Sequence, residues 1–415
     1  MLKIGFSPAD ILIPQSVTME NWSVVACDQY TSEPEYWQRV AERVNGCPSA
    51  YHMILPEAWL QDPAVEDRIG RINGAMEQYL AEGIFAEYPD TYIYVERTVA
   101  PGKIRRGLIG KIDLMEYDYS KGSQSLVRPT EGTVESRLPP RIRVRENAPL
   151  ELPHIMVLLD DSARTVIEPL AVRISGMQKL YDFNLMEQGG HISGYAVDAQ
   201  SRAGIDAALG ALAGAQAAQS ASPLLFAVGD GNHSLATAKA CFEKLRAELP
   251  KEQWENHPAR YALVELVNVH DPAMEFEPIH RIVCGVDPDA LLAEICRYYR
   301  VSDAADSGQS LTYVTRERTG CLFIENPSSA LAVGTLQNFL DDYLAKHGGT
   351  VDYIHGDDVL KSLAQSPDAI GFLLPAMQKS ELFPTVVADG ALPRKTFSMG
   401  HAYEKRYYLE CRRIK

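Results

Sequence analysis

The sequence lacks the cysteine pattern of a disulfide-bonded or zinc-binding protein. Its 415 residues include seven cysteines, an odd number that is spread along the chain without a single Cys-x-x-Cys pair. A framework of disulfides and a zinc site held by cysteines are therefore both unexpected. We expect most of these thiols to fill space in the core of a protein that stays in the reducing cytoplasm.

Long hydrophobic runs and positive charge are also scarce. No segment approaches the roughly 18 consecutive apolar residues of a membrane helix, and the N-terminus, Met-Leu-Lys-Ile-Gly, lacks the apolar stretch of a signal peptide. The 40 lysines and arginines are outnumbered by 55 acidic residues, which gives a formal net charge of -15. A surface of this sign repels the nucleic-acid backbone. The sequence therefore predicts a soluble cytoplasmic protein with neither a membrane nor a nucleic acid as partner.

The remaining composition, with 46% hydrophobic and 23% charged residues, is that of an ordinary globular protein. At roughly 150 residues per domain, the chain has room for about two to three domains. Apolar and polar residues alternate on both sides of a Pro-Gly-Lys turn at 101–103, which predicts a β-hairpin there. We expect three α+β regions, at 1–100, 101–290 and 291–415.

The most informative segment is a strand, a glycine turn and a helix that follow one another without a gap. An apolar run at 223–228 predicts a buried strand, the turn spans 229–234, and apolar residues then recur at helical spacing as far as Pro250. Free N–H groups at the start of a helix, together with the helix dipole, suit an anion such as phosphate. The same pattern is also typical of a plain Asp-Gly turn that caps a helix.

The residues around this turn resemble a known phosphate-binding motif. Residues 227–238 read Ala-Val-Gly-Asp-Gly-Asn-His-Ser-Leu-Ala-Thr-Ala, which is similar to the D-G-[HN]-H-R-x-x-A box of the ParB/sulfiredoxin-like superfamily, whose loop holds nucleotide phosphates. Over nearly its whole length the chain also resembles the DUF 1015 (domain of unknown function) family. The pieces that carry this second resemblance are Pro56-Glu57, Arg106-Gly107-Leu108, Arg128 to Thr133, Asn268 to Pro272, Pro278 to Arg281, Tyr353 to Gly356 and Leu392 to Thr396.

These resemblances imply a ParB/sulfiredoxin-like nucleotide-binding core at 101–290, flanked by N-terminal and C-terminal α+β regions. They imply a small-molecule phosphotransferase similar to free L-serine kinases, with ATP, ADP or pyrophosphate and Mg²⁺ on the donor side and a small hydroxyl compound as acceptor. In this carry-over Glu131 is the base that acts on the acceptor hydroxyl. The implied site residues are Glu131, Asp230 and His233 for catalysis; Gly229, Gly231, Asn232, Ser234, Arg281, Arg394 and Lys395 for the donor; Thr133, Arg137, His280 and His355 for the acceptor; and Asp230 for the metal.

Two departures from the family patterns weaken the positive charge of the loop. Ser234 stands where the superfamily usually has an arginine that contacts phosphate, and Thr130 stands where a histidine usually precedes the glutamate. Because a neutral hydroxyl offers one donor and no charge, a cation from elsewhere must face a bound phosphate. We predict that Arg281, or the pair Arg394-Lys395, contacts the turn at 231–233.

Other functions predict other sequence features. A non-catalytic nucleotide-binding regulatory protein, in the manner of ParB-type CTP switches, would carry a DNA-binding helix-turn-helix that the sequence does not reveal. A redox repair enzyme of the sulfiredoxin kind would need a cysteine in the loop, where this chain has Asn232 and His233. The final 25 residues hold seven basic and two acidic side chains, and we expect a closing strand that lends cations to an anionic small-molecule site. A homodimer is left open.

Overall fold

The computed structural model describes residues 3–302 and 308–415, which form two compact units. The first unit contains residues up to Met274 together with His401–Lys415, and the second is Glu275–Gly400. This division differs from the expected boundaries near residues 100 and 290. Strands on both sides of residue 100 belong to one sheet, and the C-terminal segment pairs with strands of the first unit, so neither expected boundary separates independent bodies.

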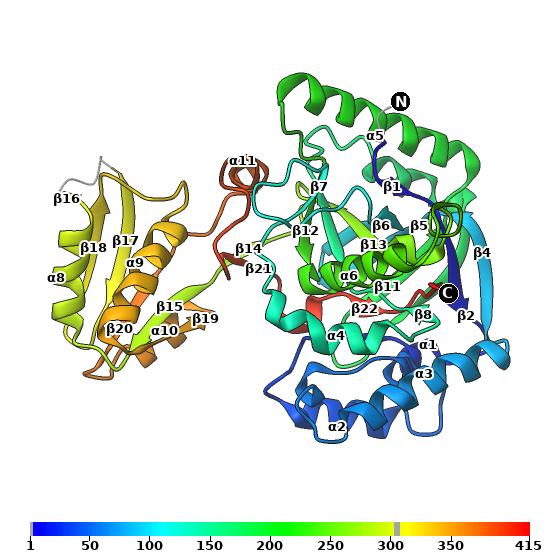
Figure 1. Ribbon diagram of the computed structural model, residues 1–415, viewed down its shortest axis with the longest axis horizontal. Helices are drawn as coiled ribbons and strands as arrows, with labels where there is room; N and C mark the ends of the chain where they lie inside the picture. Colours follow the sequence, from blue (N-terminus) through cyan, green and yellow to red (C-terminus); the bar gives the residue numbers. More distant parts are fainter. Residues whose placement is uncertain (1–2, 303–307) are drawn as a thin grey trace. The chain divides into compact units, whose positions relative to one another are not determined.

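A nine-stranded mixed sheet forms the centre of the first unit (Figure 1). Its order is β10 (Gln178–Asn184), β11 (His191–Ala196), β5 (Ile93–Ala100), β6 (Lys103–Asp113), β13 (Tyr261–Asn268), β9 (Met156–Leu159), β12 (Phe226–Asp230) and β7 (Val127–Pro129), and β1 (Phe6–Ser7) pairs with β6. The β5–β6 pair is the predicted hairpin and is antiparallel, whereas the β13–β9 and β12–β7 pairs are parallel.

Both faces of this sheet are buried, each against a hydrophobic core of its own. Successive side chains of one strand point to opposite faces and therefore belong to different cores. Ile93 and Val95 of β5 lie in one hydrophobic core, and Tyr92 and Tyr94 lie in the other. The first core is covered by α2 (Pro34–Arg43), α3 (Val65–Ala81) and the C-terminal segment, and the second by α5 (Ala199–Gln219) and α6 (Asn232–Glu248). The helix α5 is rich in alanine and buries Ile205, Leu209 and Ala213.

Shorter elements complete the first unit. The helices are α1 (Met19–Trp22), α4 (Leu138–Arg145) and α7 (Lys251–Trp254), and 3₁₀ turns include Ala50–Met53, Glu57–Trp59, Glu135–Arg137, Glu168–Gly176, Pro258–Arg260 and Ala402–Glu404. Three two-stranded pairs are β2 (Ala9–Pro14) with β4 (Phe85–Thr91), β22 (Tyr407–Tyr408) with β3 (Val24–Val25), and β23 (Arg412–Arg413) with β8 (Leu150–Glu151). In place of the one closing strand expected near the C-terminus, the structure has two short strands, β22 and β23, after a 3₁₀ turn.

The second unit is a smaller α+β body. Its six-stranded sheet has the order β16 (Val301–Ser302), β18 (Thr319–Ile324), β17 (Gln309–Val314), β20 (Ala369–Leu373), β15 (His280–Cys284) and β19 (Thr350–Ile354). Its helices are α8 (Pro288–Tyr298), α9 (Ala332–His347), α10 (Asp357–Leu363) and α11 (Lys379–Asp389), and β14 (Phe276–Pro278) pairs with β21 (Phe397–Met399). Across the described part of the chain, no helix combines the length and apolar character needed to cross a membrane.

Candidate functional site

The predicted strand, turn and helix are present at β12 and α6. β12 ends at Asp230, α6 begins at Asn232, and Gly231 between them has φ +75°. A Cβ atom at Gly231 would lie 3.0 Å from the Cα atom of Ile155, and the left-handed backbone conformation also favours glycine. The turn is therefore tighter than the sequence predicts, because helical structure already starts at Asn232.

The parallel pairing of β7 with β12 brings the Glu131 segment to this turn. Val127 pairs with Phe226, and Pro129 pairs with Val228. Thr130, the next residue, donates hydrogen bonds from its backbone N–H and from Oγ1 to the carbonyl oxygen of Val228, at 3.2 and 2.7 Å. Glu131 thus leaves the sheet at the same edge as Asp230, although about a hundred residues separate the two in the sequence.

The first turn of α6 contacts the segment that carries Glu131. Asn232 Nδ2 lies 3.5 Å from Thr130 Oγ1, and the backbone N–H of Val134 donates to His233 Nε2 at 3.4 Å. The structure therefore brings the segment that carries Glu131 next to Asn232 and His233, and the sequence analysis assigned all three residues to one site. Thr133 lies in the same segment, and Arg137 ends the 3₁₀ turn that precedes α4.

A buried histidine that the sequence analysis did not select lies against the first turn of α6. His154, 4% exposed, places Nε2 3.3 Å from Ser234 Oγ and Nδ1 2.7 Å from the hydroxyl of Tyr408. Its Nε2 is also 3.9 Å from Asp28 Oδ2. Burial acts against the charged form of Asp28, but His154, Gln29 and Lys405 outweigh it and hold the pKa of this carboxyl below its usual value. His154 thus links Ser234 of the loop to an ionised carboxylate.

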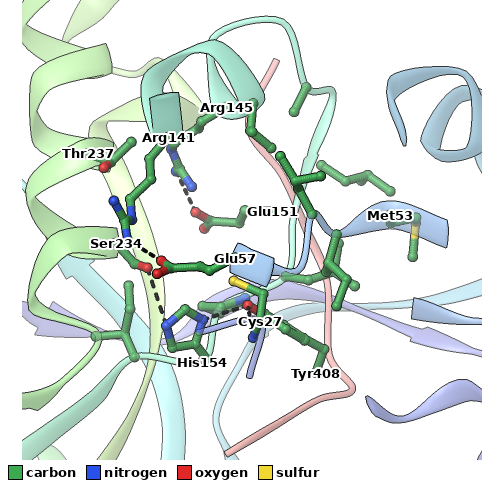
Figure 2. A pocket seen from close by; sticks show the side chains of 18 of the residues that line it. Cys27, Met53, Glu57, Arg141, Arg145, Glu151, His154, Ser234, Thr237 and Tyr408 are labelled. Atoms are coloured by element: carbon green, nitrogen blue, oxygen red, sulfur yellow. Dashed lines mark hydrogen bonds and ion pairs between the residues drawn. The ribbon is translucent and has the colours of Figure 1, made fainter. Parts of the chain in front are cut away.

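A pocket opens beside this histidine (Figure 2). Ser234 and Thr237 of α6 line the pocket, and Arg141 and Arg145 extend into it from α4, which packs against α6. Arg141 pairs with Glu57, and Arg145 lies 2.5 Å from Glu151. The remaining lining is mostly apolar and includes Met53, Ile54, Leu55, Leu60, Met76, Val144, Ala148, Leu150 and Leu152. Its volume is about 140 Å³, close to the roughly 150 Å³ that holds one benzene-sized molecule.

A cation that the structure places at the turn is Lys405, from the basic C-terminal segment. Its Nζ lies 3.3 Å from Asp230 Oδ2, with the two side chains 12% and 17% exposed. The other carboxylate oxygen of Asp230 accepts the backbone N–H of Gly231 at 3.0 Å. The basic composition of the C-terminal segment predicted a cation from this part of the chain, but it did not distinguish Lys405 from the other basic residues.

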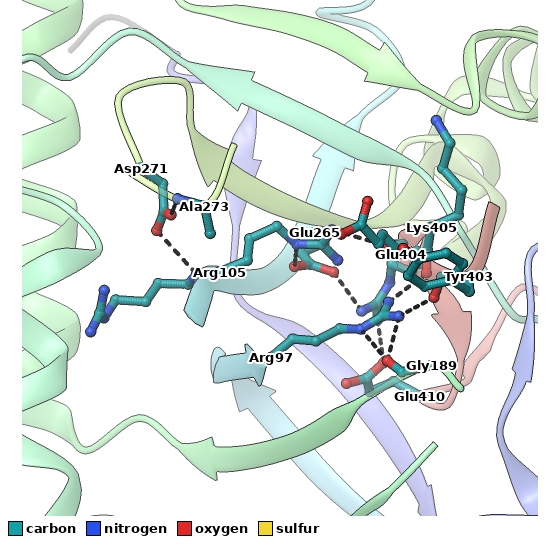
Figure 3. A network of polar contacts seen from close by, with 12 residues as sticks. Arg97, Arg105, Gly189, Glu265, Asp271, Ala273, Tyr403, Glu404, Lys405 and Glu410 are labelled. Atoms are coloured by element: carbon teal, nitrogen blue, oxygen red, sulfur yellow. Dashed lines mark hydrogen bonds and ion pairs between the residues drawn. The ribbon is translucent and has the colours of Figure 1, made fainter. Parts of the chain in front are cut away.

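Buried arginines of the central sheet hold the segment that carries Lys405 (Figure 3). Arg97 of β5 donates to the carbonyl oxygens of Tyr403 and Lys405, and Arg105 of β6 donates to that of Glu404 at 3.0 Å. Burial, together with the neighbouring Arg105, lowers the pKa of Arg97 to about 9. These contacts fix the carbonyl oxygens of three consecutive residues, 403 to 405, and so hold the backbone of Lys405 in place.

A buried ion-pair network continues from these arginines. Arg406 lies 2.6 Å from Glu265 Oε2 of β13 and also pairs with Glu410. Burial alone would raise the pKa of Glu265, but Arg406, Arg105 and Arg97 together hold it below its usual value. Because removal of one partner would leave a buried charge uncompensated, this network anchors the C-terminal segment firmly.

Comparison with known proteins places the chain in a family. Residues 10–343 match the family described as "Protein of unknown function (DUF1015)". The chain belongs to the DUF1015 family. No curated protein matches the sequence.

Solved structures similar to this DUF1015 protein have low sequence identity to it. SbnI with a C-terminal truncation from Staphylococcus aureus is 10% identical, with a TM-score of 0.38 over 72% of this chain and 85% of that one. A free serine kinase in complex with AMP is 11% identical, with a TM-score of 0.39 over 72% and 90% of the two chains. A conserved hypothetical protein from Pyrococcus furiosus is 10% identical, with a TM-score of 0.35 and coverage of 72% and 90%.

Three of the segments that carry the sequence resemblance, at 278–281, 353–356 and 392–396, lie in the second unit. Arg281 of β15 is fully buried and donates to the carbonyl oxygens of Ile279, Arg394 and Lys395, at 2.6, 2.9 and 3.0 Å. Its guanidinium also lies 4.7 Å from the ring centroid of Tyr353, which pairs with it across β15 and β19. These contacts give Arg281 a structural role inside its own unit.

The structure also describes the other predicted residues of the second unit. His280 Nε2 lies 2.9 Å from Asp357, and His280 Nδ1 accepts the backbone N–H of Leu374 at 3.1 Å. Arg394 pairs with Asp341 at 2.9 Å, and His355 follows β19 directly. The expected contact of Arg281, Arg394 or Lys395 with the turn at 231–233 stays a prediction.

Proposed function

We propose that this DUF1015 protein is a small-molecule phosphotransferase, which transfers the terminal phosphoryl group of ATP, ADP or pyrophosphate to a hydroxyl compound. The observation that carries the proposal is the parallel β7–β12 pair, from which the Glu131 segment and the Asp230 turn leave at one edge of the sheet. A ParB/sulfiredoxin-like core is part of the proposal. It rests on the resemblance of the loop sequence, and the strand, turn and helix at β12 and α6 are compatible with it.

On this proposal, the first turn of α6 binds the donor phosphates. α6 has 17 residues, so its free N–H groups and its dipole act together on an anion near Asn232 to Ser234. Gly231 is buried and allows the tight turn into the helix, because it has φ +75° and no side chain that would meet Ile155. Lys405 is 3.3 Å from Asp230 and supplies the positive charge that Ser234 cannot. Phosphoryl transfer depends mainly on such positioning and charge neutralisation.

The residues at the turn fit a magnesium ion that arrives with the donor. Mg²⁺ is usually held by one or two carboxylates together with substrate phosphates. Asp230 offers a carboxylate, and Asn232 Oδ1 is a buried oxygen that has no hydrogen-bond partner among the described atoms. Within residues 3–302 and 308–415 no three metal-binding side chains gather, so a ligand set completed by the phosphates is the one that fits. When bound, the ion would neutralise charge on the phosphates.

The proposed reaction needs one proton acceptor. The acceptor hydroxyl oxygen forms a bond to the terminal phosphorus while the bond from that phosphorus to its bridging oxygen breaks, and the electron pair leaves with the shortened donor. The hydroxyl proton passes to the carboxylate of Glu131 and then to solvent. The products are a phosphate monoester and a donor with one phosphate fewer. A positioned base of this kind contributes about 10²- to 10⁴-fold in rate.

Phosphorus NMR tests this function directly. The purified full-length protein is incubated with Mg²⁺, one of the three donors and one hydroxyl compound at a time, with L-serine among the acceptors. We expect a new monoester resonance that grows as the donor resonance declines, and that is absent for Glu131→Gln. Donor binding in calorimetry without any monoester would contradict the transferase and would favour a nucleotide-binding regulatory protein.

A further inference from the structure

The charged arginine and glutamate side chains of the pocket beside His154 already form ion pairs. Arg141 pairs with Glu57, and Glu151 pairs with both Arg145 and Arg412. Burial, together with Asp28 and Glu57, raises the pKa of the Cys27 thiol, which therefore stays neutral. A zwitterionic ligand would have to displace these ion pairs, because charged groups lose hydration in such a site and need new partners. An apolar body loses little on entry and gains by burial.

The end of the pocket next to α6 is different, because it offers a hydroxyl group and an imidazole ring. Ser234 Oγ and His154 Nε2 are 3.3 Å apart there, and both line the pocket. Tyr408 holds the other ring nitrogen of His154 at 2.7 Å and accepts the backbone N–H of Cys27 at 3.3 Å. When Nδ1 donates to Tyr408, Nε2 is left to accept a hydrogen bond from a hydroxyl group. The pocket thus has one polar end and an apolar interior, and a matching ligand has a hydroxyl group on an apolar body.

We infer that this pocket binds the phosphoryl acceptor, and that the acceptor is an uncharged alcohol with an aliphatic body of about four to six carbons rather than a free amino acid. The assignment as acceptor rests on the proposed function, whereas the binding of such an alcohol does not. The aliphatic body contacts Met53, Leu55, Val144 and Leu152, and the hydroxyl group meets Ser234 and His154.

This placement brings the hydroxyl to the proposed transfer site. Ser234 is in the first turn of α6, and the two residues before it contact the segment that carries Glu131. On the other side, His154 is 3.9 Å from Asp28, whose carboxylate is stabilised in part by Lys405. Lys405 in turn pairs with Asp230 of the turn. The pocket and the turn are therefore consecutive parts of one surface in the first unit.

Ligand-observed NMR tests the inference without any donor. Saturation-transfer spectra of the full-length protein are recorded with 1-pentanol, pentanoate and L-serine. We expect 1-pentanol to bind more tightly than either charged compound. Val144→Phe, which fills the pocket from α4, should weaken 1-pentanol binding at least tenfold. The same exchange at Val172, which is 86% exposed, is the matched control and should leave binding unchanged.

Each outcome separates this inference from the proposed function. Equal 1-pentanol binding by the wild type and by a folded Val144→Phe protein would overturn the pocket assignment, as would a preference for pentanoate or L-serine. Should the phosphorus NMR find transfer to L-serine while 1-pentanol does not bind, the transferase stands and the aliphatic acceptor is wrong. If 1-pentanol binds in the pocket but no donor phosphorylates it or any other hydroxyl compound, the alcohol site stands and the transferase is wrong.

Discussion

The role of Lys405 gives the sharpest test of the donor site. We consider Lys405→Met, which keeps the length of the side chain and removes its charge. Nζ lies 3.3 Å from Asp230 Oδ2, and the lysine side chain is only 12% exposed, so solvent weakens the interactions of this charge less than it would at the surface. A charge-assisted contact to phosphate contributes roughly 1.5 to 3 kcal/mol. Because about 1.4 kcal/mol corresponds to a factor of ten, donor binding should weaken by about ten- to hundredfold.

Calorimetric titration with ADP and Mg²⁺ at about 50 and about 200 mM salt measures this effect, since a charge contact makes binding depend on salt. The variant should show weaker binding and a smaller loss of affinity on addition of salt. Lys361→Met in α10, at a lysine that is 50% exposed, is the matched control and should bind ADP as the wild type does. Wild-type affinity and salt dependence in Lys405→Met would refute the argument, because the charge would then play no part in donor binding.

A loss of affinity could also follow from a damaged fold, and a second variant distinguishes the two causes. Lys405→Met leaves Asp230 without its cation in a mostly buried position, which lowers stability. Adding Asp230→Asn removes that unpaired charge. We expect the double variant to recover thermal stability, measured as Tm, and to remain defective in ADP binding when both proteins are titrated without Mg²⁺, which takes the proposed role of Asp230 as a metal ligand out of the comparison. Recovery of both properties would mean that Lys405 serves only to neutralise Asp230.

Three further perturbations test the base, the turn and the buried network. Glu131→Gln should reduce turnover by about 10²- to 10⁴-fold while ADP affinity in calorimetry stays the same, and equal turnover would place the base elsewhere. Gly231→Ala should lower the free energy of unfolding in urea by about 1 kcal/mol or more, because the residue has φ +75° and a methyl group would meet backbone at 3.0 Å; Gly210→Ala, in open space on α5, should not destabilise the protein. The folded pKa of Glu265 lies below its usual value, so its ionised form stabilises the fold above that value and the contribution is lost as pH falls through the folded pKa. The difference in unfolding free energy between the wild type and Glu265→Gln should therefore be larger at pH 7 than at pH 4, whereas Glu66→Gln, at an exposed pair, should show little difference at either pH.

Local patterns in the sequence were sufficient for the elements that position the turn. A short apolar run followed by glycines and then by helical spacing predicted β12 and α6, and alternation around a Pro-Gly turn predicted β5 and β6. Each pattern depends on residues that are close in the chain and on one buried face. The start of α6 was placed slightly too late, because Asn232 reads as a turn residue although it is already helical.

The contacts between distant segments could not be predicted in the same way. β7 has three residues, and nothing in its local sequence shows that it pairs with β12 rather than with another strand. Lys405 was one of seven basic residues in the C-terminal segment. Its selection depends on Arg97 and Arg105, which lie about 300 residues earlier and fix the carbonyl oxygens around it. The domain boundaries were misplaced for a related reason, since the last residues return to a sheet that starts near the N-terminus.

The replacement at Ser234 and the position of Lys405 have one physical explanation on the proposed function. An arginine at position 234 would bring charge to the turn, but it would also place a long cationic side chain where Ser234 now contacts His154 at 3.3 Å and lines the pocket. With serine there, the pocket keeps a small neutral group at its polar end. The positive charge then has to come from another element, and Lys405 lies on the Asp230 side of the turn, held by Arg97 and Arg105. Placing the cation for the donor on the Asp230 side of the turn, away from Ser234, would in this way let an uncharged alcohol and an anionic donor bind side by side.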